Sequence, residues 1–319
     1  MKPPYQITDN ILQLIASISE KIGAINATHL YKPPTELRKR NRIKTIQSSL
    51  EIEGNTLSEE QITALLENKR VLAPQKDILE VQNAITVYEQ LHDFNPNDLK
   101  DLEKAHKILM QGLIENGGML RTKNVGIVKG AKVAHVAPSG DLVWGLMKNL
   151  FNYLKNDADI ILIKSCVFHY EFEFIHPFLD GNGRMGRLWQ TLILMQQYPV
   201  FEFLPVESLI KENQQHYYDV LSQSDKMGAS TSFIEFMLGI MLQSLESLLK
   251  SQNRSLSVAD RIELFKDNVG TASFARKTYL QAYKDISEPT ASRDLKWAVD
   301  NGILEKIGAN RLTKYTYVN

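Results

Sequence analysis

The sequence predicts a mainly α-helical protein that contains a small β-hairpin, and two patterns lead to this prediction. Apolar residues recur at helical spacing through most of the chain, as between Asn10 and Ile25. Over 121–137 the pattern changes, because valine and isoleucine alternate on either side of Lys129-Gly130, as in a short hairpin. The expected helices span 10–25, 35–53, 56–69, 78–94, 99–114, 142–154, 160–175, 183–195, 210–221, 233–249, 259–269, 274–283 and 289–301.

Composition and charge narrow the classes of function. The 319 residues suggest two or three domains, and the 37 Lys+Arg balance the 37 Asp+Glu, so no overall field attracts nucleic acid or anionic membrane. The single cysteine, Cys166, excludes a disulfide framework. The first twenty residues carry acids, unlike a secretory signal, and no run of eighteen apolar residues predicts a membrane span. We therefore expect a cytoplasmic protein with no membrane partner.

The stretch 176–187 joins two apolar segments and is expected to form a tight loop between buried helices. Its glycines allow a ligand to approach the backbone closely, and the helix that begins near Gly183 directs free amides at an anion such as phosphate. Two arginines add charged donors, Asp180 supplies an oxygen ligand suited to Mg²⁺, and His176 is a candidate general base. The combination indicates nucleotide phosphate chemistry. The alternative is a Gly-rich turn with a solvated histidine and surface arginines.

These residues resemble the Fic family signature, His-Pro-Phe-x-Asp/Glu-Gly-Asn-Gly-Arg-x-x-Arg, at every fixed position. The resemblance implies a Fic-type helical bundle that transfers AMP from ATP to a Tyr, Ser or Thr hydroxyl of a target protein and releases pyrophosphate. It implies His176 as the catalytic base and Asp180 as the Mg²⁺ ligand. The residues it assigns to ATP are Gly181, Asn182, Gly183, Arg184, Met185, Gly186, Arg187 and, from a later Tyr-Tyr pair, Tyr217. A buried helix residue is the alternative for Tyr217, and Asp225, where some relatives have asparagine, leaves nucleotide choice open.

A second motif precedes the signature by more than a hundred residues. Glu53 is expected in the last turn of the helix 36–53, where the macrodipole disfavours an anion, so a cationic partner is expected elsewhere. The stretch from Ser49 to Gly54 resembles the inhibitory motif Ser/Thr-x-x-x-Glu-Gly/Asn of Fic proteins, which implies that Glu53 pairs with Arg187. Gly54-Asn55 is expected to end the helix, and Thr56 with Glu59 to cap the next one.

The Fic resemblance also assigns a partner to the predicted hairpin, and the C-terminal region carries a separate resemblance. In the family the hairpin around 125–136 is a flap whose edge pairs with the target backbone, as an exposed strand edge can; an ordinary surface hairpin is the alternative. Self-modification and a homodimer are further expectations. The order of elements after the Ser-rich stretch 251–257 resembles a winged helix-turn-helix, with 303–307 and 312–318 as its strands. Its reading face would carry Thr290, Ser292, Arg293, Lys296 and Trp297.

The charge of this last region argues for caution about DNA. Residues 255–319 hold ten Lys/Arg and eight Asp/Glu, a net of +2, and Asp294 and Asp300 fall on the supposed reading helix. Protein docking or dimerisation is therefore favoured over DNA binding. The predicted organisation is an N-terminal helical region at 1–95, a catalytic domain at 96–250 and a winged-helix domain at 258–319. The alternative function is a DNA-binding transcriptional regulator whose Fic part senses a nucleotide.

Overall fold

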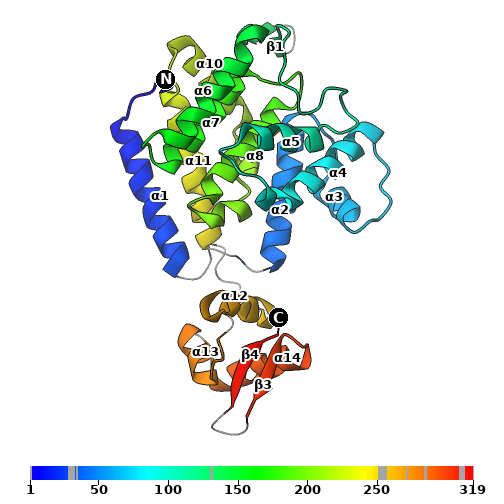
Figure 1. Cartoon of the computed structure of the whole chain (residues 1–319), viewed down its shortest axis with the longest axis vertical. Helices are drawn as coiled ribbons and strands as arrows, with labels where there is room; N and C mark the ends of the chain where they lie inside the picture. Colours follow the sequence, from blue (N-terminus) through cyan, green and yellow to red (C-terminus); the bar gives the residue numbers. More distant parts are fainter. Residues whose placement is uncertain are drawn as a thin grey trace. The chain divides into compact units, whose positions relative to one another are not determined.

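The computed structural model describes residues 2–27, 33, 35–129, 132–250, 257–270, 272–283, 286–308 and 313–318. These residues form two compact units, which Figure 1 colours along the sequence. The first unit contains residues up to 27 and 38–250, and so includes both the predicted N-terminal region and the predicted catalytic region. The second contains 33, 35–37 and 257–318. The predicted Ser-rich linker, apart from Ser257, lies outside the described residues.

The first unit is built from helices and one two-stranded sheet, which confirms the predicted fold class at this level. In chain order its elements are α1 (Asp9–Ala27), α2 (Thr35–Ile52), α3 (Glu59–Leu66), α4 (Gln75–Glu89), α5 (Leu99–Leu109), β1 (Gly126–Lys129), β2 (Lys132–Val136), α6 (Val143–Asn156), α7 (Ile161–Ile175), α8 (Asn182–Met195), α9 (Val206–Glu212), α10 (Gln214–Met227) and α11 (Thr231–Lys250). Short 3₁₀ turns lie at Leu91–Asp93, Gly140–Leu142 and Pro199–Phe203.

The centre of this unit is the pair α7 and α8, which pack on each other and flank the signature loop. Helix α7 is apolar on most of its faces, as expected for a helix surrounded by protein, and Cys166, Phe168 and Phe172 are fully buried. Helix α6 and helix α11 cover α7. The loop between α7 and α8 is therefore attached at both ends to the most buried helices of the unit.

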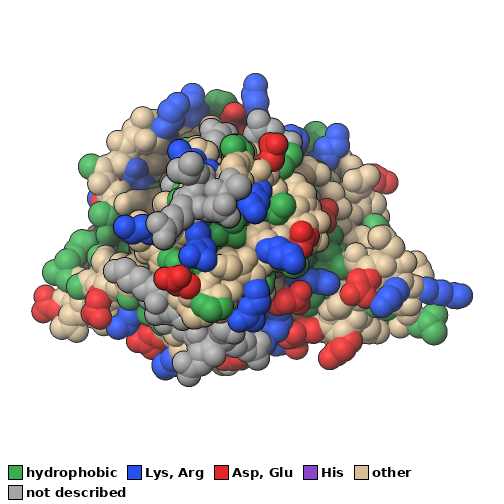
Figure 2. All heavy atoms as spheres, turned by 90° about the horizontal axis from the view of Figure 1, so that it is seen from below, with side chains coloured by type: hydrophobic (Ala, Val, Ile, Leu, Met, Phe, Trp, Pro, Cys, Tyr) green, Lys and Arg blue, Asp and Glu red, His purple; other side chains and the backbone are tan. Residues whose placement is uncertain are grey.

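Charged side chains of both signs are spread over the surface. On the face shown in Figure 2, Lys and Arg side chains lie interspersed with Asp and Glu side chains. This mixture agrees with the equal numbers of basic and acidic residues in the sequence.

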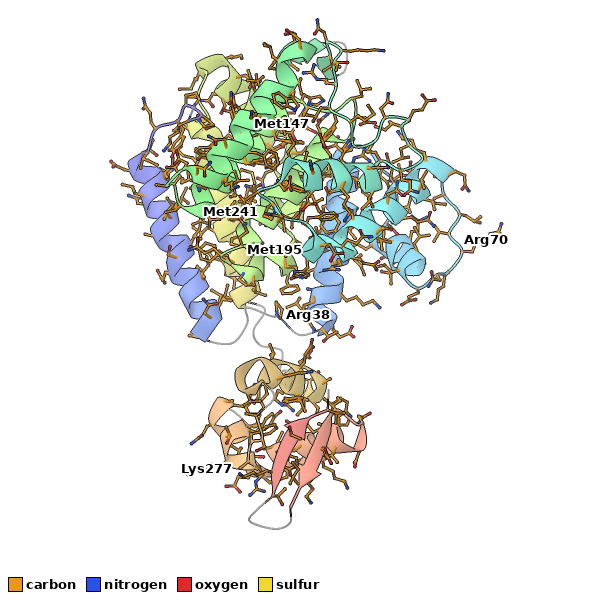
Figure 3. All side chains as sticks on the ribbon, in the orientation of Figure 1. Arg38, Arg70, Met147, Met195, Met241 and Lys277 are labelled. Carbon is orange, nitrogen blue, oxygen red and sulfur yellow. The ribbon has the colours of Figure 1, made fainter. Side chains whose placement is uncertain are left out.

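Helix α11 is, among the described residues, one helix whose length and hydropathy would suffice to cross a membrane. Half of its apolar segment is buried inside the bundle, where α11 packs against α1, α7, α9 and α10. Figure 3 marks Met241 of α11 and Met147 of α6, both fully buried. The apolar character of α11 is thus explained by its packing in the protein core.

Two local predictions in the first unit were wrong. The helix expected at 210–221 is two helices, α9 and α10, separated at Asn213. The capping box of α3 consists of Ser58 and Gln61 rather than Thr56 and Glu59. The reason is that the Thr56 hydroxyl donates to Asp77 of α4 at 2.7 Å and so cannot cap α3. Helix α3 therefore begins at Glu59.

Strands β1 and β2 form the predicted hairpin, and residues 130–131 lie outside the described residues. The strands are antiparallel, with Gly126 opposite Val136 and Lys129 opposite Lys132, and the register shifts between Ile127 and Val128. Such a bulge bends and twists a hairpin locally.

The second unit consists of α12 (Val258–Val269), α13 (Arg276–Ala282), α14 (Glu288–Asp300), β3 (Leu304–Ile307) and β4 (Lys314–Tyr317). Strands β3 and β4 are antiparallel, and Phe274 forms a further bridge with Tyr315. The order of elements is the one predicted. Asp294 on α14, however, is 1 % exposed and binds the Arg261 guanidinium through both oxygens, at 2.7 and 3.0 Å. Asp294 thus lies on the predicted helix, and its carboxylate is buried there because it neutralises the Arg261 guanidinium.

We expect the Arg261–Asp294 pair to determine the stability of the second unit. Removing one partner of a buried ion pair leaves the other charge uncompensated and costs about 3–5 kcal/mol. Asp294→Ala should lower hydrogen-exchange protection of α12 and α14 by at least ~10²-fold. Asp300→Ala, which removes an exposed carboxylate from the same helix, is the matched control. Equal protection in the two variants would contradict the assignment.

Candidate active site

His176 lies where α7 ends. Its backbone has φ 50° and ψ 62°, a left-handed conformation that few residues other than glycine adopt, and its N–H donates to the Phe172 carbonyl at 2.9 Å. Pro177 follows and cannot continue a helix. The chain therefore turns sharply at His176, which is half-buried at the mouth of the loop. Its role as a base stays a prediction.

The loop is closed by Asn182 and by a histidine that sequence reasoning missed. The Asn182 amide accepts from the Phe178 N–H and donates to the Phe178 carbonyl, both at 2.9 Å. His106 of α5 stacks on the Phe178 ring at 3.6 Å and contacts the Asp180 carbonyl through Nε2 at 2.9 Å. The Gly118 N–H donates to His106 Nδ1, so Nε2 carries the proton and donates to Asp180. Burial lowers the pKa of His106 to about 4, and it acts as a neutral clamp on the loop.

Arg187, the second arginine of the signature, is 2 % exposed and is bound by the end of α2. Its Nε donates to the Ser49 hydroxyl at 3.1 Å, and one terminal nitrogen donates to the Ser49 carbonyl at 2.9 Å and to Glu53 at 2.8 Å. Burial by itself would lower the pKa of Arg187, but the Glu53 carboxylate raises it above its ordinary value. The predicted pairing of Glu53 with Arg187 is thus present.

Gly183 makes room for this pair. A Cβ atom at residue 183 would lie 2.3 Å from a Glu53 carboxylate oxygen and 3.1 Å from an Arg187 nitrogen. Since real Cβ atoms essentially never come as close as 2.3 Å to another atom, the Glu53 carboxylate occupies the space that the missing side chain leaves at the start of α8. The same position is where the sequence predicted that an anion would approach the helix N-terminus.

Arg184 is held differently from Arg187. It is 5 % exposed and forms an ion pair with Glu80 of α4 at 3.2 Å, and it lies 3.5 Å from Asp180. Glu80, which the sequence did not single out, also accepts from Asn55 at 2.9 Å. The Asp180 side chain is 56 % exposed and accepts from the Gly181 N–H. In the described parts of the chain, three His, Cys, Asp or Glu side chains nowhere gather to hold a metal.

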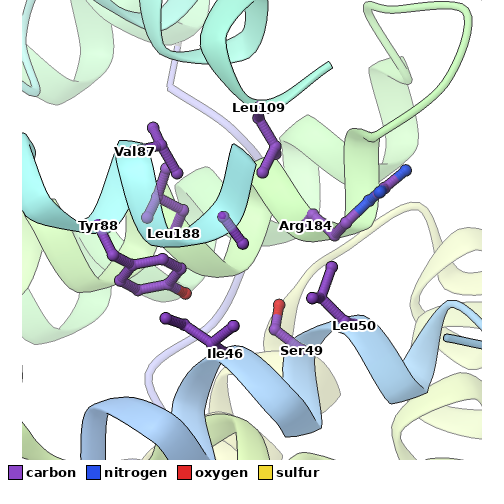
Figure 4. A pocket seen from close by; sticks show the side chains of 9 residues that line it. Ile46, Ser49, Leu50, Val87, Tyr88, Leu109, Arg184 and Leu188 are labelled. Atoms are coloured by element: carbon purple, nitrogen blue, oxygen red, sulfur yellow. The ribbon is translucent and has the colours of Figure 1, made fainter. Parts of the chain in front are cut away.

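A water-sized cavity lies between α2 and its neighbours. Its volume is about 10 Å³, and Figure 4 shows Ser49 and Leu50 of α2 facing Val87 and Leu188 across it, with Arg184 at its edge. Interiors are normally close-packed, so side chains lining a void lose dispersion contacts. The contact of α2 with the core is therefore incomplete directly beside Ser49.

Tyr217 is a core residue. It is 2 % exposed, contacts Phe233 and Phe236, and lies 3.1 Å from His169 Nε2 through its hydroxyl. His169 is fully buried, contacts Gln190 at 2.7 Å, and has a pKa lowered to about 3 by burial. This matches the buried-aromatic alternative for Tyr217; an adenine contact by its ring stays a prediction.

Met185, Gly186 and Asp225, which the sequence analysis also named, contact other parts of the protein. Met185 is fully buried, and a Cβ at Gly186 would lie 3.0 Å from Glu173 and 3.1 Å from His169. Asp225 accepts from the Tyr170 hydroxyl at 3.0 Å. Close packing of α7 on α8 thus explains Gly186 without a ligand.

Glu207 of α9 is a buried acid behind Arg187 that the sequence did not reveal. It is 2 % exposed, lies 3.4 Å from the Tyr88 hydroxyl, and lines a small cavity together with Arg187. Burial raises the pKa of Glu207 to about 7, although Arg187 favours its charged form. An isolated glutamate in an amphipathic helix gives no sequence signal of such an environment.

Comparison with known proteins places this arrangement in a class. The Fic/DOC family pattern matches residues 96–194, the segment that contains the signature loop. The crystal structure of a Fic family protein from Desulfovibrio desulfuricans G20 is 39 % identical, covers 100 % of this chain and 99 % of that one, and superposes with a TM-score of 0.77. A helical bundle that joins two buried helices by this loop is the Fic/DOC class of protein. The chain belongs to the Fic family.

Other relatives are more distant. The protein adenylyltransferase Fic of Nematostella vectensis is 29 % identical over 258 residues, which are 77 % of this chain and 57 % of that protein. The chain thus spans about half the length of the curated relatives it matches. A Fic domain containing signaling protein from Bacteroides thetaiotaomicron is 19 % identical with a TM-score of 0.59, which shows a shared fold.

We expect Glu207 to make stability depend on pH. Its pKa is raised from 4.5 to about 7, so the folded protein holds a proton that the unfolded chain releases between these values. Stability from this group is therefore present at low pH and lost as pH rises through 7. Relative to Glu207→Gln, the wild type should lose up to about 3 kcal/mol of unfolding free energy between pH 5 and 8 in urea titrations. Parallel pH profiles would contradict this. The opposite effects of His106 and His169 are common to both proteins and cancel.

Proposed function

We propose that this protein is an adenylyltransferase that transfers AMP from ATP to a hydroxyl of a target protein and releases pyrophosphate. The observation that carries the proposal is the loop 176–187 at the α7–α8 junction, where His176 stands at the mouth and the N-terminus of α8 lies next to Gly183 and Arg187. Membership of the Fic family, and the adenylyltransferase names of relatives such as that of Nematostella vectensis, support it.

Each group has a role that its position allows. His176 takes the proton of the attacking Tyr, Ser or Thr hydroxyl, whose oxygen then forms a bond to the α-phosphorus as the bond to pyrophosphate breaks. The first amides of α8 lack partners within the helix and face the phosphates, and the helix dipole favours their charge. Arg187 neutralises the terminal phosphate, and Asn182 and His106 hold the loop in shape. Arg184 reaches the nucleotide if its bond to Glu80 opens.

Mg²⁺ fits this site as part of the nucleotide complex. Mg²⁺ is commonly bound through one or two carboxylates together with substrate phosphates, and Asp180 offers one exposed carboxylate at the loop. When bound, the ion would neutralise phosphate charge, and Asp180 would hold it.

We infer that Glu53 inhibits the enzyme. Its carboxylate occupies Arg187 and the space beside Gly183, both of which the terminal phosphate requires. An ATP molecule that enters beside Glu53 would have its phosphates displaced, and a misplacement of ~1 Å can cost ~10²-fold in rate. Ser49 stabilises this arrangement by accepting two further hydrogen bonds from Arg187.

The second unit is proposed to be a winged helix-turn-helix, with β3 and β4 as the wing. Burial of Asp294 leaves Arg293 and Lys296 exposed on α14, which makes its outer face more basic than the sequence count suggested. We propose a protein as the partner of this unit, with DNA as the alternative. We further propose that a target protein docks on the β1–β2 hairpin, that the protein can modify itself and form a homodimer, and that it is cytoplasmic.

Glu53→Gly tests the function and the inhibition together. Removal of the carboxylate frees Arg187 without removing any group assigned to the chemistry, so incorporation of labelled AMP from ATP should rise at least ~10²-fold. Glu53→Gly/Arg187→Ala and Glu53→Gly/His176→Ala should be silent. Glu51→Gly is the matched control, because Glu51 lies in the same helix end but pairs with Lys211.

The outcomes separate the two proposals. If Glu53→Gly shows no transfer and mass spectrometry finds no AMP adduct, the proposed activity is wrong. If the wild type and Glu53→Gly transfer AMP equally, the activity stands and the inhibitory role of Glu53 is wrong.

The role of Asp180 can be tested in the same background. In Glu53→Gly, Asp180→Ala should lower transfer by at least ~10²-fold and abolish its rise with added Mg²⁺, since a carboxylate that helps hold the ion is lost. Titration of MgATP by calorimetry should show weaker binding. An unchanged Mg²⁺ dependence would make Asp180 a structural residue of the loop.

A further inference from the structure

Arg121 lies at the base of the β1–β2 hairpin and is 3 % exposed. Its guanidinium donates four hydrogen bonds to backbone carbonyls of 2.7–2.9 Å, so four of its five N–H groups have partners. The carbonyls belong to two parts of the chain that are more than thirty residues apart in sequence. One part is the end of α7, and the other is the pair of segments that enter and leave the hairpin.

On the first side, Arg121 binds the chain around His176. Its Nε donates to the His176 carbonyl at 2.7 Å, and a terminal nitrogen donates to the Ile175 carbonyl at 2.9 Å. The backbone N–H of Arg121 donates to the Pro177 carbonyl at 2.8 Å. Three successive carbonyls at the helix C-terminus thus have their partner in one residue. A cation there offsets the helix dipole and stabilises the left-handed turn at His176.

On the second side, the same guanidinium holds both stems of the hairpin. One terminal nitrogen donates to the Lys123 carbonyl, and the nitrogen that binds Ile175 also donates to the Pro138 carbonyl, both at 2.8 Å. The stems are close together, because the Gly140 N–H donates to Asn124 at 2.9 Å and a Cβ at Gly140 would lie 2.1 Å from the Thr122 carbonyl. The stems and the turn at His176 therefore share a rigid, planar connector.

We propose that Arg121 is a positioning residue that fixes His176 in its left-handed conformation and couples it to the stems of the hairpin. Rearrangement of the stems, as when a target strand binds the hairpin, would then be transmitted to the base. A lysine cannot replace this function, because an ammonium group is a point charge whereas the guanidinium fork reaches four carbonyls in fixed directions. The proposal rests on the proposed function of His176.

The test compares Arg121→Lys and Asn124→Ala with Arg70→Lys in the full-length Glu53→Gly protein. Arg70 is exposed, and Figure 3 shows it directed away from the rest of the protein. The first readout is the ¹⁵N spectrum of the histidine side chains, in which His176 is identified by its loss in His176→Ala. The others are MgATP affinity by calorimetry and the rate of AMP transfer.

Arg121→Lys should shift or broaden the His176 signals and lower the rate of AMP transfer by ~10–10²-fold. The MgATP affinity should change by less than about twofold. Asn124→Ala, which loosens the stems without touching Arg121, should move the same signals by less, and Arg70→Lys should move none. Unchanged His176 signals in Arg121→Lys would overturn the proposal, as would a fall in transfer accompanied by equal loss of MgATP binding. If Arg121→Lys does not fold, unchanged signals in Asn124→Ala overturn it. The spectra need no transfer, so the result is distinguishable from failure of the proposed activity.

Discussion

The site depends on one physical constraint, the need of a deeply buried guanidinium for an anionic partner. Arg187 is almost inaccessible to water, and a charge in such a place is costly unless it is paired and hydrogen-bonded. Glu53 and the two oxygens of Ser49 supply the partners. In the proposed reaction a phosphate replaces Glu53, so inhibitor and substrate satisfy the same charge and exclude each other. The proposed competition requires the end of α2 to reach α8, and the Glu53–Arg187 ion pair provides that contact although the two helices are distant in sequence.

The structure also divides the signature residues by the kind of work they do. Gly183 leaves space beside the start of α8, Gly186 allows α7 and α8 to approach, and Asn182 closes the loop on Phe178. His176 and Arg187 have roles in the proposed chemistry. At least three positions of the stretch 176–187 therefore have a role in its shape. The loop is also fixed from outside, by His106 on one side and Arg121 on the other.

Sequence reasoning found the residues that form a contiguous motif and the helices that carry a long apolar period. It located α7, α8 and the hairpin, and through the resemblance it paired Glu53 with Arg187 across more than a hundred residues. It missed His106, Glu80, Arg121 and Glu207, because each is a single polar residue whose role arises from partners far away in the chain. Nor did the sequence indicate that the Asp294 side chain is buried, because its partner Arg261 lies on another helix, 33 residues earlier in the chain.

The absence of a side chain at residue 183 has a consequence for how such a protein can change over generations. The Glu53 carboxylate and the proposed phosphate site share that one opening, so a side chain at residue 183 would displace the carboxylate from its present position. Residue 53 lies outside the signature, so under the proposed inhibition a substitution there would remove the restraint while every signature residue is preserved. Under the proposed function, selection for activity alone would preserve the loop, and Glu53 would be preserved only by selection for control.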